Sequence, residues 1–578
     1  MTSTTNNPNQ YKLHYGITLI ALFIFSLVAC FLGYQSYFVL HGEEHNWIRS
    51  LYRTFQLFTF EGGDLLEPIP WTLHIARFTA PLTTAMAIVI ALDEIFNEQW
   101  KRMKISRMKN HVVIIGFGTK GKNVMEECQR KREKVLVVER DPLNTNLASI
   151  KPPTGRLLMA DADNKNTFIK ARITKAKSVF LLMGDDAGQI TACLHIYQLI
   201  IESSRDETNP LSCIMHLQNQ DLVNIMRNHN LVRDTEDGFA LKIFNAYENG
   251  ARELFQENPP DRSGITLSSE NYVQIIIFGF GKAGEALALQ TALTGHYING
   301  KKVHVLIIDR LAEEKEAEFL KRYPTYTDYC DLTFEALEAN SPQLIPHLVK
   351  YLEDPYALTT MVLCFDNKTN NILLGLQLEN VKLNEKDEPY QVFVRTNDNE
   401  SFTTISRNLI PYLEPAKVCS QEVIIEGELD RKAKAIHAFY LKKRKESSDF
   451  GTKEVDVSWE NMSQEYKDSN RKAADHIGVK MRGIGCEIVG KNDPRPSATF
   501  SEEEIEKLSE LEHRRWNAER SLAGWTFDKQ KNSKTRKTPY LTDWNNLTED
   551  IKDYDREAVK NIPNVLDLVG MKAVRRKI

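Results

Sequence analysis

Two long apolar stretches stand out near the start of the chain. The first, residues 17–40, reads ITLIALFIFSLVACFLGYQSYFVL and carries no charge, and the second covers residues 71–92. About 20 apolar residues in a helix are enough to cross the roughly 30 Å hydrocarbon layer of a bilayer. The pattern therefore predicts two transmembrane helices. The alternative for the first stretch is a cleaved signal peptide, whose apolar region is usually shorter, and no small-residue cleavage pattern follows before Tyr34.

The charges that flank these stretches predict their orientation. Lys12 precedes the first stretch, whereas Glu43 and Glu44 follow it. A basic run comes directly after the second stretch: Lys101, Arg102, Lys104, Arg107 and Lys109. Because basic residues stay on the cytoplasmic side, we expect a multi-pass protein of the plasma (inner) membrane with both termini in the cytoplasm.

Two residues within the second stretch depart from a plain apolar span. Arg77 is tolerated there only if it faces water, protein or lipid headgroups, and a position near the outer interface is the simpler alternative. Pro81 removes one helix hydrogen bond and should bend the helix. We therefore predict Pro81 as a gating hinge.

Between the two stretches lies SLYRTFQLFTFEGGDLLEPIP, an aromatic amphipathic piece followed by a glycine-containing loop. Irregular backbone at membrane depth must be buried in protein or line a cavity. This order of elements resembles the pore unit of potassium channels, and the loop resembles their filter signature TVGYGD. The resemblance implies a filter at Thr59, Phe60, Glu61, Gly62, Gly63 and Asp64.

The predicted filter differs from that signature at its centre. Thr59, Gly63 and Asp64 match it, but Phe60, Glu61 and Gly62 replace Val, Gly and Tyr. In a four-chain pore the Glu61 carboxylates would form an acidic ring that attracts cations, which predicts a weakly selective pore for monovalent cations. In the alternative, Glu61 turns away from the axis and pairs with protein.

A glycine-rich turn between two strands follows the basic run. The strand at residues 112–115 leads into three glycines, a helix, and a second strand at 135–138 that ends in Glu139. The glycines are Gly116, Gly118 and Gly121. This spacing is typical of a Rossmann turn, in which the glycines let a pyrophosphate approach the helix and the acid binds a ribose hydroxyl.

The same pattern occurs a second time, with Gly279, Gly281 and Gly284 followed by a strand that ends in Asp309. Later segments also correspond, with Asp186 and Asp366 at comparable positions. A period of roughly 160 residues indicates duplication. Two unrelated Rossmann turns would explain the glycines but not the later strand.

The segment RLLMADADNKNTFIKARITKAKSVFLLMGDD, with Asp161, Ala171 and Asp186, resembles the RCK domains, also called TrkA-N domains, of gated channels. The resemblance covers residues 108–400. It implies a homotetramer whose two units per chain form a cytoplasmic ring of eight. It also implies a regulatory ligand such as NAD(H), ATP, ADP or another nucleotide, although such units also bind cations or nothing. The site residues implied are Gly116, Gly118, Gly121, Glu139, Asp161, Gly279, Gly281, Gly284 and Asp309.

Helix-forming and charged residues dominate after about residue 415. Residues 429–441 form an amphipathic pattern, and the stretch at residues 502–525 predicts a second helix with Ser501 as its N-cap, Glu504 three residues later and Gly524 as its end. From residue 429 to 570 the chain resembles the ryanodine receptor repeat, or RyR domain. The residues expected in its ligand pocket are His437, Asn470, Arg471, His513, Trp516, Arg520 and Trp525. Alternatively, the tryptophans fill a small helical core.

Composition excludes several other classes of protein. The net charge is −4, which gives no reason to expect nucleic acid as a partner. The eight cysteines are widely spaced and form no CxxC pair, so neither a disulfide framework nor a metal site is expected. No recognisable arrangement for hydride transfer accompanies the Rossmann turns, so we expect no enzyme activity.

The predicted fold is a membrane α-helical pore unit with two spans and a re-entrant loop, followed by two Rossmann-like α/β domains with parallel sheets and an α-helical RyR domain. The expected boundaries are 1–100, 108–265, 268–415 and 425–578. The predicted function is a subunit of a ligand-gated cation channel of the potassium type. The alternatives are a membrane-anchored receptor that does not conduct, and the regulatory subunit of a separate ion-uptake system.

Overall fold

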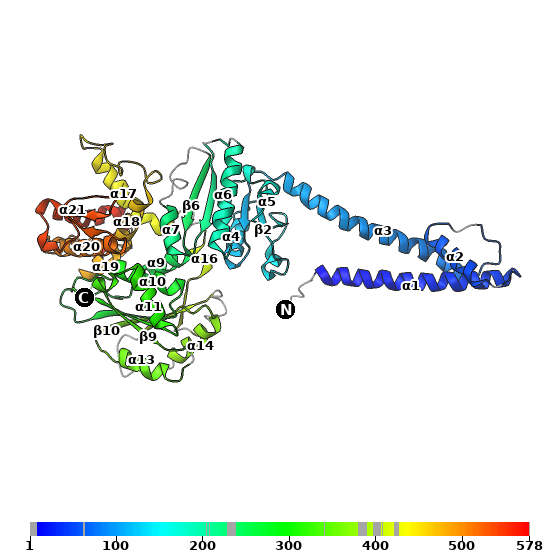
Figure 1. Ribbon diagram of the computed structural model, residues 1–578, viewed down its shortest axis with the longest axis horizontal. Coiled ribbons are helices and arrows are strands. Elements are labelled where there is room, and N and C mark those ends of the chain that lie inside the picture. Colours follow the sequence, from blue (N-terminus) through cyan, green and yellow to red (C-terminus); the bar gives the residue numbers. More distant parts are fainter. Residues whose placement is uncertain are drawn as a thin grey trace. The chain divides into compact units, whose positions relative to one another are not determined.

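The computed structural model describes residues 8–44, 46–61, 64–203, 205–206, 208–227, 238–339, 341–379, 390–396, 406, 409–420, 423 and 427–576. The chain divides into two compact units, Met1–Arg107 and Met108–Ile578 (Figure 1). Each unit is described by itself.

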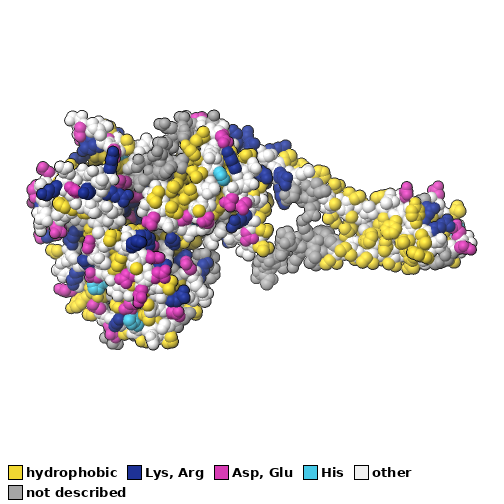
Figure 2. All heavy atoms as spheres, in the orientation of Figure 1, with side chains coloured by type: hydrophobic (Ala, Val, Ile, Leu, Met, Phe, Trp, Pro, Cys, Tyr) yellow, Lys and Arg dark blue, Asp and Glu magenta, His cyan; other side chains and the backbone are white. Residues whose placement is uncertain are grey.

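The first unit consists of three helices: α1 (Pro8–Leu40), α2 (Trp47–Phe58) and α3 (Trp71–Ser106). The segments Ile17–Leu40 and Trp71–Leu92 have the length and apolar composition of membrane spans, as predicted. Apolar side chains cover much of the surface of this unit in Figure 2, and Phe78, for example, is 78% exposed. Such a surface suits a lipid environment better than water.

Close packing joins the three helices of this unit. Tyr34, Leu57 and Leu73 are almost fully buried between them. Gly33 allows the contact between α1 and α3, because a Cβ there would lie 3.0 Å from the backbone nitrogen of Leu73. After α2, the backbone N–H of Leu66 donates to the hydroxyl of Tyr37 over 3.0 Å, which ties the connecting segment to α1.

The second unit begins with a six-stranded parallel sheet in the order β3-β2-β1-β4-β5-β6. This is the strand order of a Rossmann fold. Its strands are β1 (Val112–Ile115), β2 (Val135–Glu139), β3 (Gly155–Met159), β4 (Ser178–Leu181), β5 (Leu211–His216) and β6 (Phe239–Phe244). The helices are α4 (Thr119–Arg130), α5 (Lys165–Lys170), α6 (Asp186–Glu202), α7 (Gln220–Arg227) and α9 (Ala246–Glu257), with 3-10 turns η1 (Thr145–Ser149) and η2 (Ile173–Lys175).

A second parallel sheet repeats this topology in the order β12-β11-β10-β7-β8-β9. Read from the other edge, it is the same Rossmann order, which confirms the two predicted α/β domains. Its strands are β7 (Tyr272–Phe278), β8 (Val303–Asp309), β9 (Cys330–Ala336), β10 (Ala357–Leu363), β11 (Gln391–Arg395) and β12 (Leu409–Tyr412). The helices are α10 (Lys282–Thr294), α11 (Ala312–Arg322), α12 (Tyr326–Tyr329), α13 (Leu344–Leu352), α14 (Lys368–Glu379) and α16 (Pro415–Val418).

The C-terminal region is mainly helical, as predicted, with the addition of short strands. Its helices are η4 (Glu428–Asp430), α17 (Arg431–Arg444), α18 (Gln464–Asp475), α19 (Ile477–Gly483), α20 (Glu502–Leu522), η5 (Trp544–Asn546), α21 (Glu549–Lys560) and α22 (Ile562–Leu568). The strands are β13 (Cys486–Gly490), β14 (Thr526–Phe527), β15 (Lys537–Thr538) and β16 (Met571–Arg575), and β13 pairs antiparallel with β16. Ser501 and Glu504 form the predicted capping box at the start of α20.

Buried ion pairs connect the first α/β domain to the C-terminal region. Arg252 on α9 lies 2.8 Å from the carboxylate of Asp475 and 3.1 Å from that of Asp430. On α7, Arg227 lies 3.6 Å from Asp468. We call these residues, together with Arg471, the interdomain ion cluster: Arg227, Arg252, Asp430, Asp468, Arg471 and Asp475. The cluster fixes the C-terminal helices against the first α/β domain.

All eight cysteines of the chain lie among the described residues, and each is buried with a free thiol. Burial raises the pKa of Cys330, Cys364 and Cys419 to about 12. These thiols therefore remain protonated at neutral pH and contribute to the packing of the cores.

Candidate nucleotide-binding sites

The glycine turn after β1 is shaped by two close backbone contacts. Gly116 has a φ of 87°, and a Cβ there would lie 2.9 Å from the nitrogen of Met183. A Cβ on Gly121 would lie 2.5 Å from the carbonyl oxygen of Gly116. A Cβ on Gly118, in contrast, would have no other atom within 4 Å. Gly116 and Gly121 are therefore required for the backbone of the turn to pack this closely, whereas the space next to the Cα of Gly118 is open.

The carboxylate of Glu139 holds this turn in place. It accepts hydrogen bonds from the backbone nitrogens of Phe117 and Arg140, each over 2.8 Å, and of Asp141 over 3.0 Å. The amide of Asn144 donates a fourth bond over 3.2 Å. Burial alone would raise the pKa of Glu139, but these donors lower it below its ordinary value.

A carboxylate has about four acceptor positions, and four donors from the protein itself contact Glu139. The ribose role expected for Glu139 therefore remains a prediction, and its structural role is to organise the turn. Sequence reasoning placed the acid correctly at the end of the strand, but the donors around it depend on how the following segment folds back.

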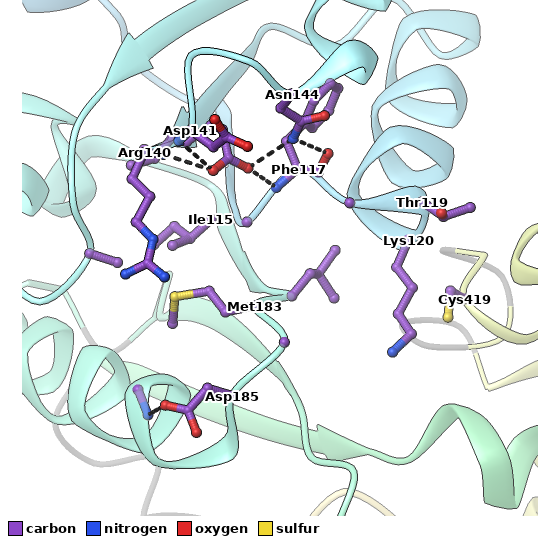
Figure 3. Close-up of a pocket in the computed structure, with 18 of the residues that line it drawn as sticks. Ile115, Phe117, Thr119, Lys120, Arg140, Asp141, Asn144, Met183, Asp185 and Cys419 are labelled. Atoms are coloured by element: carbon purple, nitrogen blue, oxygen red, sulfur yellow. Dashed lines mark hydrogen bonds between the residues drawn. The ribbon is translucent and has the colours of Figure 1, made fainter. Parts of the chain in front are cut away.

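A cavity of about 730 Å³ lies beside the turn, at the carboxyl ends of the strands. Ligand pockets commonly measure about 300–1,000 Å³, so a nucleotide fits this volume. The predicted residues Gly116, Gly118, Glu139 and Asp161 all line it, whereas Gly121 is buried and is not part of its lining. Figure 3 shows Lys120 extending from the first turn of α4, with Arg140 and Met183 on another side of the cavity.

Three cations that line this cavity were not predicted, Lys120, Arg140 and Arg395, although Lys120 lies within the glycine motif itself. The ammonium of Lys120 lies 5.8 Å from the centre of the Tyr247 ring, and the guanidinium of Arg395 lies 5.7 Å from it. Burial and the nearby Arg395 lower the pKa of Lys120. Its neighbour His216, 3.2 Å away, has a pKa well below its ordinary value, chiefly through burial and then through Lys120.

The second α/β domain forms the same turn with different surroundings. Gly279 has a φ of 88°, a Cβ on Gly284 would lie 2.4 Å from the oxygen of Gly279, and Gly281 faces open space. The carboxylate of Asp309 accepts from the nitrogen of Phe280 over 2.7 Å. Here, however, a ring atom of Phe365 lies 2.8 Å from the Cβ position of Gly279. An aromatic side chain therefore lies against this turn.

The C-terminal region contains a cavity of about 500 Å³, which is lined by Trp516, Arg520 and Trp525 from the predicted pocket. The guanidinium of Arg520 lies 5.6 Å from the ring centre of Trp516 and 5.2 Å from that of Trp525. Lys467 also lines the cavity, and burial, followed by the charge of Arg471, lowers its pKa to about 8. Aromatic faces and cations are the groups that bind bases and phosphates.

The other four residues predicted for that pocket do not line this cavity. The ring of His437 lies 2.7 Å from the oxygen of Val457, and His513 lies 2.8 Å from the oxygen of Thr542. The amide of Asn470 donates to the oxygen of Tyr466. Arg471 belongs to the interdomain ion cluster, where it lies 2.6 Å from both Asp430 and Asp468. Each has polar partners within the protein.

The predicted filter lies after α2. The hydroxyl of Thr59 donates to the carbonyl oxygen of Gln56 over 2.8 Å, and the side-chain amide of Gln56 donates to the carboxylate of Glu61 over 3.3 Å. Phe60 has a φ of 66°, and Asp64 is exposed. Gly62 and Gly63 lie outside the described residues. The predicted hinge Pro81 lies within α3.

Metal binding receives no support from the part of the chain that the structure describes. No three His, Cys, Asp or Glu side chains within that part lie close enough together to hold an ion.

Two family models match parts of the chain. The TrkA-N domain matches residues 112–228, which contain the first glycine turn and most of the first sheet. The RyR domain matches residues 499–575, from the start of α20 to β16.

Curated relatives match over limited regions. An uncharacterized protein of Methanothermus fervidus is 24% identical over 206 residues, which is 33% of this chain and 31% of the relative. Potassium channel protein 1 of Methanocaldococcus jannaschii is 27% identical over 96 residues, which is 17% of this chain and 29% of the relative. The chain thus spans less than a third of the length of either relative.

Among solved structures, GsuK bound to ADP is 14% identical and covers 72% of this chain and 97% of its own, with a TM-score of 0.38. The GsuK channel bound to NAD is 12% identical and covers 86% of this chain and 90% of its own, also with a TM-score of 0.38. Scores of this size are too low to transfer a ligand or an assembly to this chain. The family models thus relate residues 112–228 to the TrkA-N domain and residues 499–575 to the RyR domain.

Proposed function

We propose that the chain is a subunit of a ligand-gated cation channel of the potassium type, whose TrkA-N-type and RyR domains bind nucleotide-type ligands and gate the pore. One observation carries this proposal: a single chain combines a membrane unit with a nucleotide-sized cavity. The membrane unit has two span-length apolar helices joined through a short amphipathic helix, and the cavity lies at a Rossmann turn. The partial match to a potassium channel protein supports it.

The proposed nucleotide site is the cavity of the first α/β domain. Gly118 leaves room for a phosphate at the start of α4, where the helix dipole favours an anion. Lys120 and Arg395 add positive charge to the same cavity. In the RyR domain, the rings of Trp516 and Trp525 and the guanidinium of Arg520 form the corresponding site.

The pore requires several chains around one axis, because the described residues of the first unit form two span-length helices per chain. We propose a homotetramer in the plasma (inner) membrane with both termini in the cytoplasm and a ring of eight RCK-type units. The domains of each chain are then residues 1–100, 108–265, 268–415 and 425–578. The ring senses ligand, Pro81 bends, and Glu61 attracts monovalent cations. This role is regulatory and involves no catalysis.

Ligand binding opens or closes such a pore only through a difference in affinity between the two states. A ligand that shifts the equilibrium tenfold must bind one state more tightly by about 1.4 kcal/mol. A site that contacts two domains can provide this difference, because its volume changes when the domains move.

The test is potassium flux into liposomes that contain the full-length protein, measured with and without ADP or NAD. We expect ligand-dependent flux in the wild type and an altered ratio of potassium to sodium flux in Glu61→Gln. The matched control is Glu44→Gln, which removes an exposed acid outside the predicted filter and should leave the ratio unchanged. A protein that binds nucleotide but passes no ions under either condition would instead be a membrane-anchored receptor.

A further inference from the structure

The nucleotide-sized cavity of the first α/β domain is partly closed by residues of the second. Arg395 lies at the end of β11, and Leu413, Pro415, Val418 and Cys419 follow β12 along the chain. All of them line the cavity together with the first glycine turn. A ligand in this cavity therefore contacts both repeats of one chain.

We propose that Arg395 and Lys120 bind the second phosphate of the ligand, so that this site selects nucleoside diphosphates and dinucleotides over nucleoside monophosphates. The inference rests on the proposed nucleotide site and specifies its ligand class. It assigns a recognition role to a residue outside the TrkA-N match, which ends at residue 228.

The placement of the two cations supports this role. Lys120 and Arg395 both lie within 6 Å of the Tyr247 ring centre, so their charges repel each other in a partly buried space. No carboxylate of the described residues forms an ion pair with Lys120, although the charge of Asp186 acts on it, and the ammonium lies 3.2 Å from the neutral ring of His216. An anion between the two cations would relieve this repulsion.

Arg395 is held in a way that a ligand can replace. Its guanidinium lies 2.8 Å from the carboxylate of Asp366, and the side chains of Arg395 and Asp366 are 22% and 91% exposed. The guanidinium also donates to the carbonyl oxygen of Cys364 over 3.3 Å, a bond that can stay when the partner carboxylate is replaced. Exposed ion pairs typically contribute at most about 1 kcal/mol. A phosphate inside the cavity is more shielded from water, and its bonds to Arg are charge-assisted and stronger.

We infer the number of phosphates in the ligand from the number of positive regions in the cavity. The first phosphate is accommodated at the glycine turn, where Gly118 leaves open space at the start of α4. Lys120 and Arg395 form a second positive region in the same cavity, and the third cation that lines it, Arg140, lies 3.9 Å from the carboxylate of Asp161. A nucleoside monophosphate has one phosphate and can satisfy only one of these regions, whereas ADP or a dinucleotide can satisfy both.

The site then links the two repeats. A second phosphate that draws Arg395 away from Asp366 adds a contact between β11 of the second repeat and α4 of the first. The same ligand without that phosphate leaves the contact unmade. The side chain of Arg395 therefore has two roles. It discriminates ADP from AMP, and through the bound ligand it attaches the two repeats to each other.

The experiment is calorimetric titration of the full-length protein in detergent with ADP and, separately, with AMP. We expect the wild type to bind ADP at least about tenfold more tightly than AMP. Arg395→Gln and Lys120→Gln should each weaken ADP binding about tenfold and change AMP binding less than about twofold. The controls are Lys122→Gln on α4, whose side chain is 40% exposed, and Lys350→Gln on α13. They remove a charge from each repeat outside the cavity and should leave both affinities unchanged.

A further variant guards against loss of folding. Asp366→Asn removes only an exposed carboxylate, so it should fold normally and, by freeing Arg395, bind ADP a few-fold more tightly. Equal affinities for ADP and AMP in the wild type, or weaker ADP binding by Asp366→Asn, would overturn the selection by Arg395 while the nucleotide site itself stands. If the wild type bound neither nucleotide, the proposed nucleotide site would fall as well.

Discussion

At the level of single residues, corresponding glycines have the same role in the two turns. Gly121 and Gly284 have no room for a Cβ because the carbonyl oxygen of the first glycine in each turn lies beside them. Gly118 and Gly281 face open space and have ordinary backbone angles. Close packing and ligand access can therefore be separated by substituting different glycines of one motif.

Gly121→Ala should destabilise the fold, whereas Gly118→Ala should not. The added methyl at residue 121 would lie 2.5 Å from a carbonyl oxygen, and overpacking of this kind typically costs about 1–3 kcal/mol. Thermal unfolding of the full-length protein should shift to lower temperature only for Gly121→Ala. Gly118→Ala should keep the wild-type midpoint but weaken ADP binding, since its methyl enters the cavity. Unchanged ADP binding would mean that the ligand does not reach this turn.

Lys467 gives the RyR cavity a response to pH. Its pKa of about 8 means that the ammonium is lost as the pH rises from 7 to 9, so binding of ADP, measured by tryptophan fluorescence, should weaken over this range.

The contribution of Lys467 to the free energy of unfolding should change in the opposite direction. The folded-state pKa lies below the ordinary value of 10.5, so the unfolded chain binds more protons between about pH 8 and 10.5 and the folded state gains stability as pH rises.

The control for this prediction is Lys467→Gln, which should lose the pH dependence of binding between pH 7 and 9. If rising pH weakened ADP binding equally in the wild type and in Lys467→Gln, a group other than Lys467 would be responsible for the pH dependence.

At the level of elements, α9 connects the first α/β domain to the C-terminal helices through the interdomain ion cluster. The side chain of Asp475 is 4% exposed and that of Arg252 is 7% exposed. Burial alone would raise the pKa of Asp430, but Arg471 and Arg252 lower it below its ordinary value. Removing one partner of such a cluster leaves an uncompensated charge in the interior.

Arg252→Met should therefore lower stability by about 3–5 kcal/mol, the usual effect of breaking a buried ion pair. The measurement is the thermal unfolding midpoint of the full-length protein in detergent. Lys301→Met is the matched control, because its pair with Glu270 is exposed and should contribute about 1 kcal/mol or less. Equal shifts for the two variants would contradict the structural importance of the cluster.

Several elements were predictable because their signals are local. The strand, the glycines and the acid of each Rossmann turn are close in sequence, and the capping box at Ser501 spans only four residues. The cavity residues Arg395 and Tyr247 could not be identified in this way, because they approach the first turn only when distant segments fold together. Likewise, Arg471 looked like a ligand residue in sequence, yet its buried partners Asp430 and Asp468 involve it in domain packing.

At the level of the whole molecule, the two repeats share one topology but differ at the turn. Phe365 lies against the second glycine turn, whereas the first opens into a cavity of about 730 Å³. The sequence period reveals the duplication, but the different environment of each turn depends on side chains that lie far along the chain. We infer that the first repeat is the better candidate for nucleotide binding.

The proposed pore predicts an assembly of four chains. Light scattering of the detergent-solubilised protein, corrected for bound detergent, should give four times the mass of one chain. A two-chain mass would leave too few span-length helices to surround an ion pathway with fourfold symmetry. Glu61→Gln should assemble like the wild type, because its carboxylate accepts a bond from Gln56 of the same chain.

The burial of all eight cysteines has two practical consequences. Oxidants and alkylating reagents react with accessible thiolates, and the folded chain offers them none on its surface. Treatment of the folded protein with a thiol-alkylating reagent should consequently leave its thermal unfolding midpoint unchanged. A cysteine introduced on the surface could also carry a spectroscopic label without first removing the native ones.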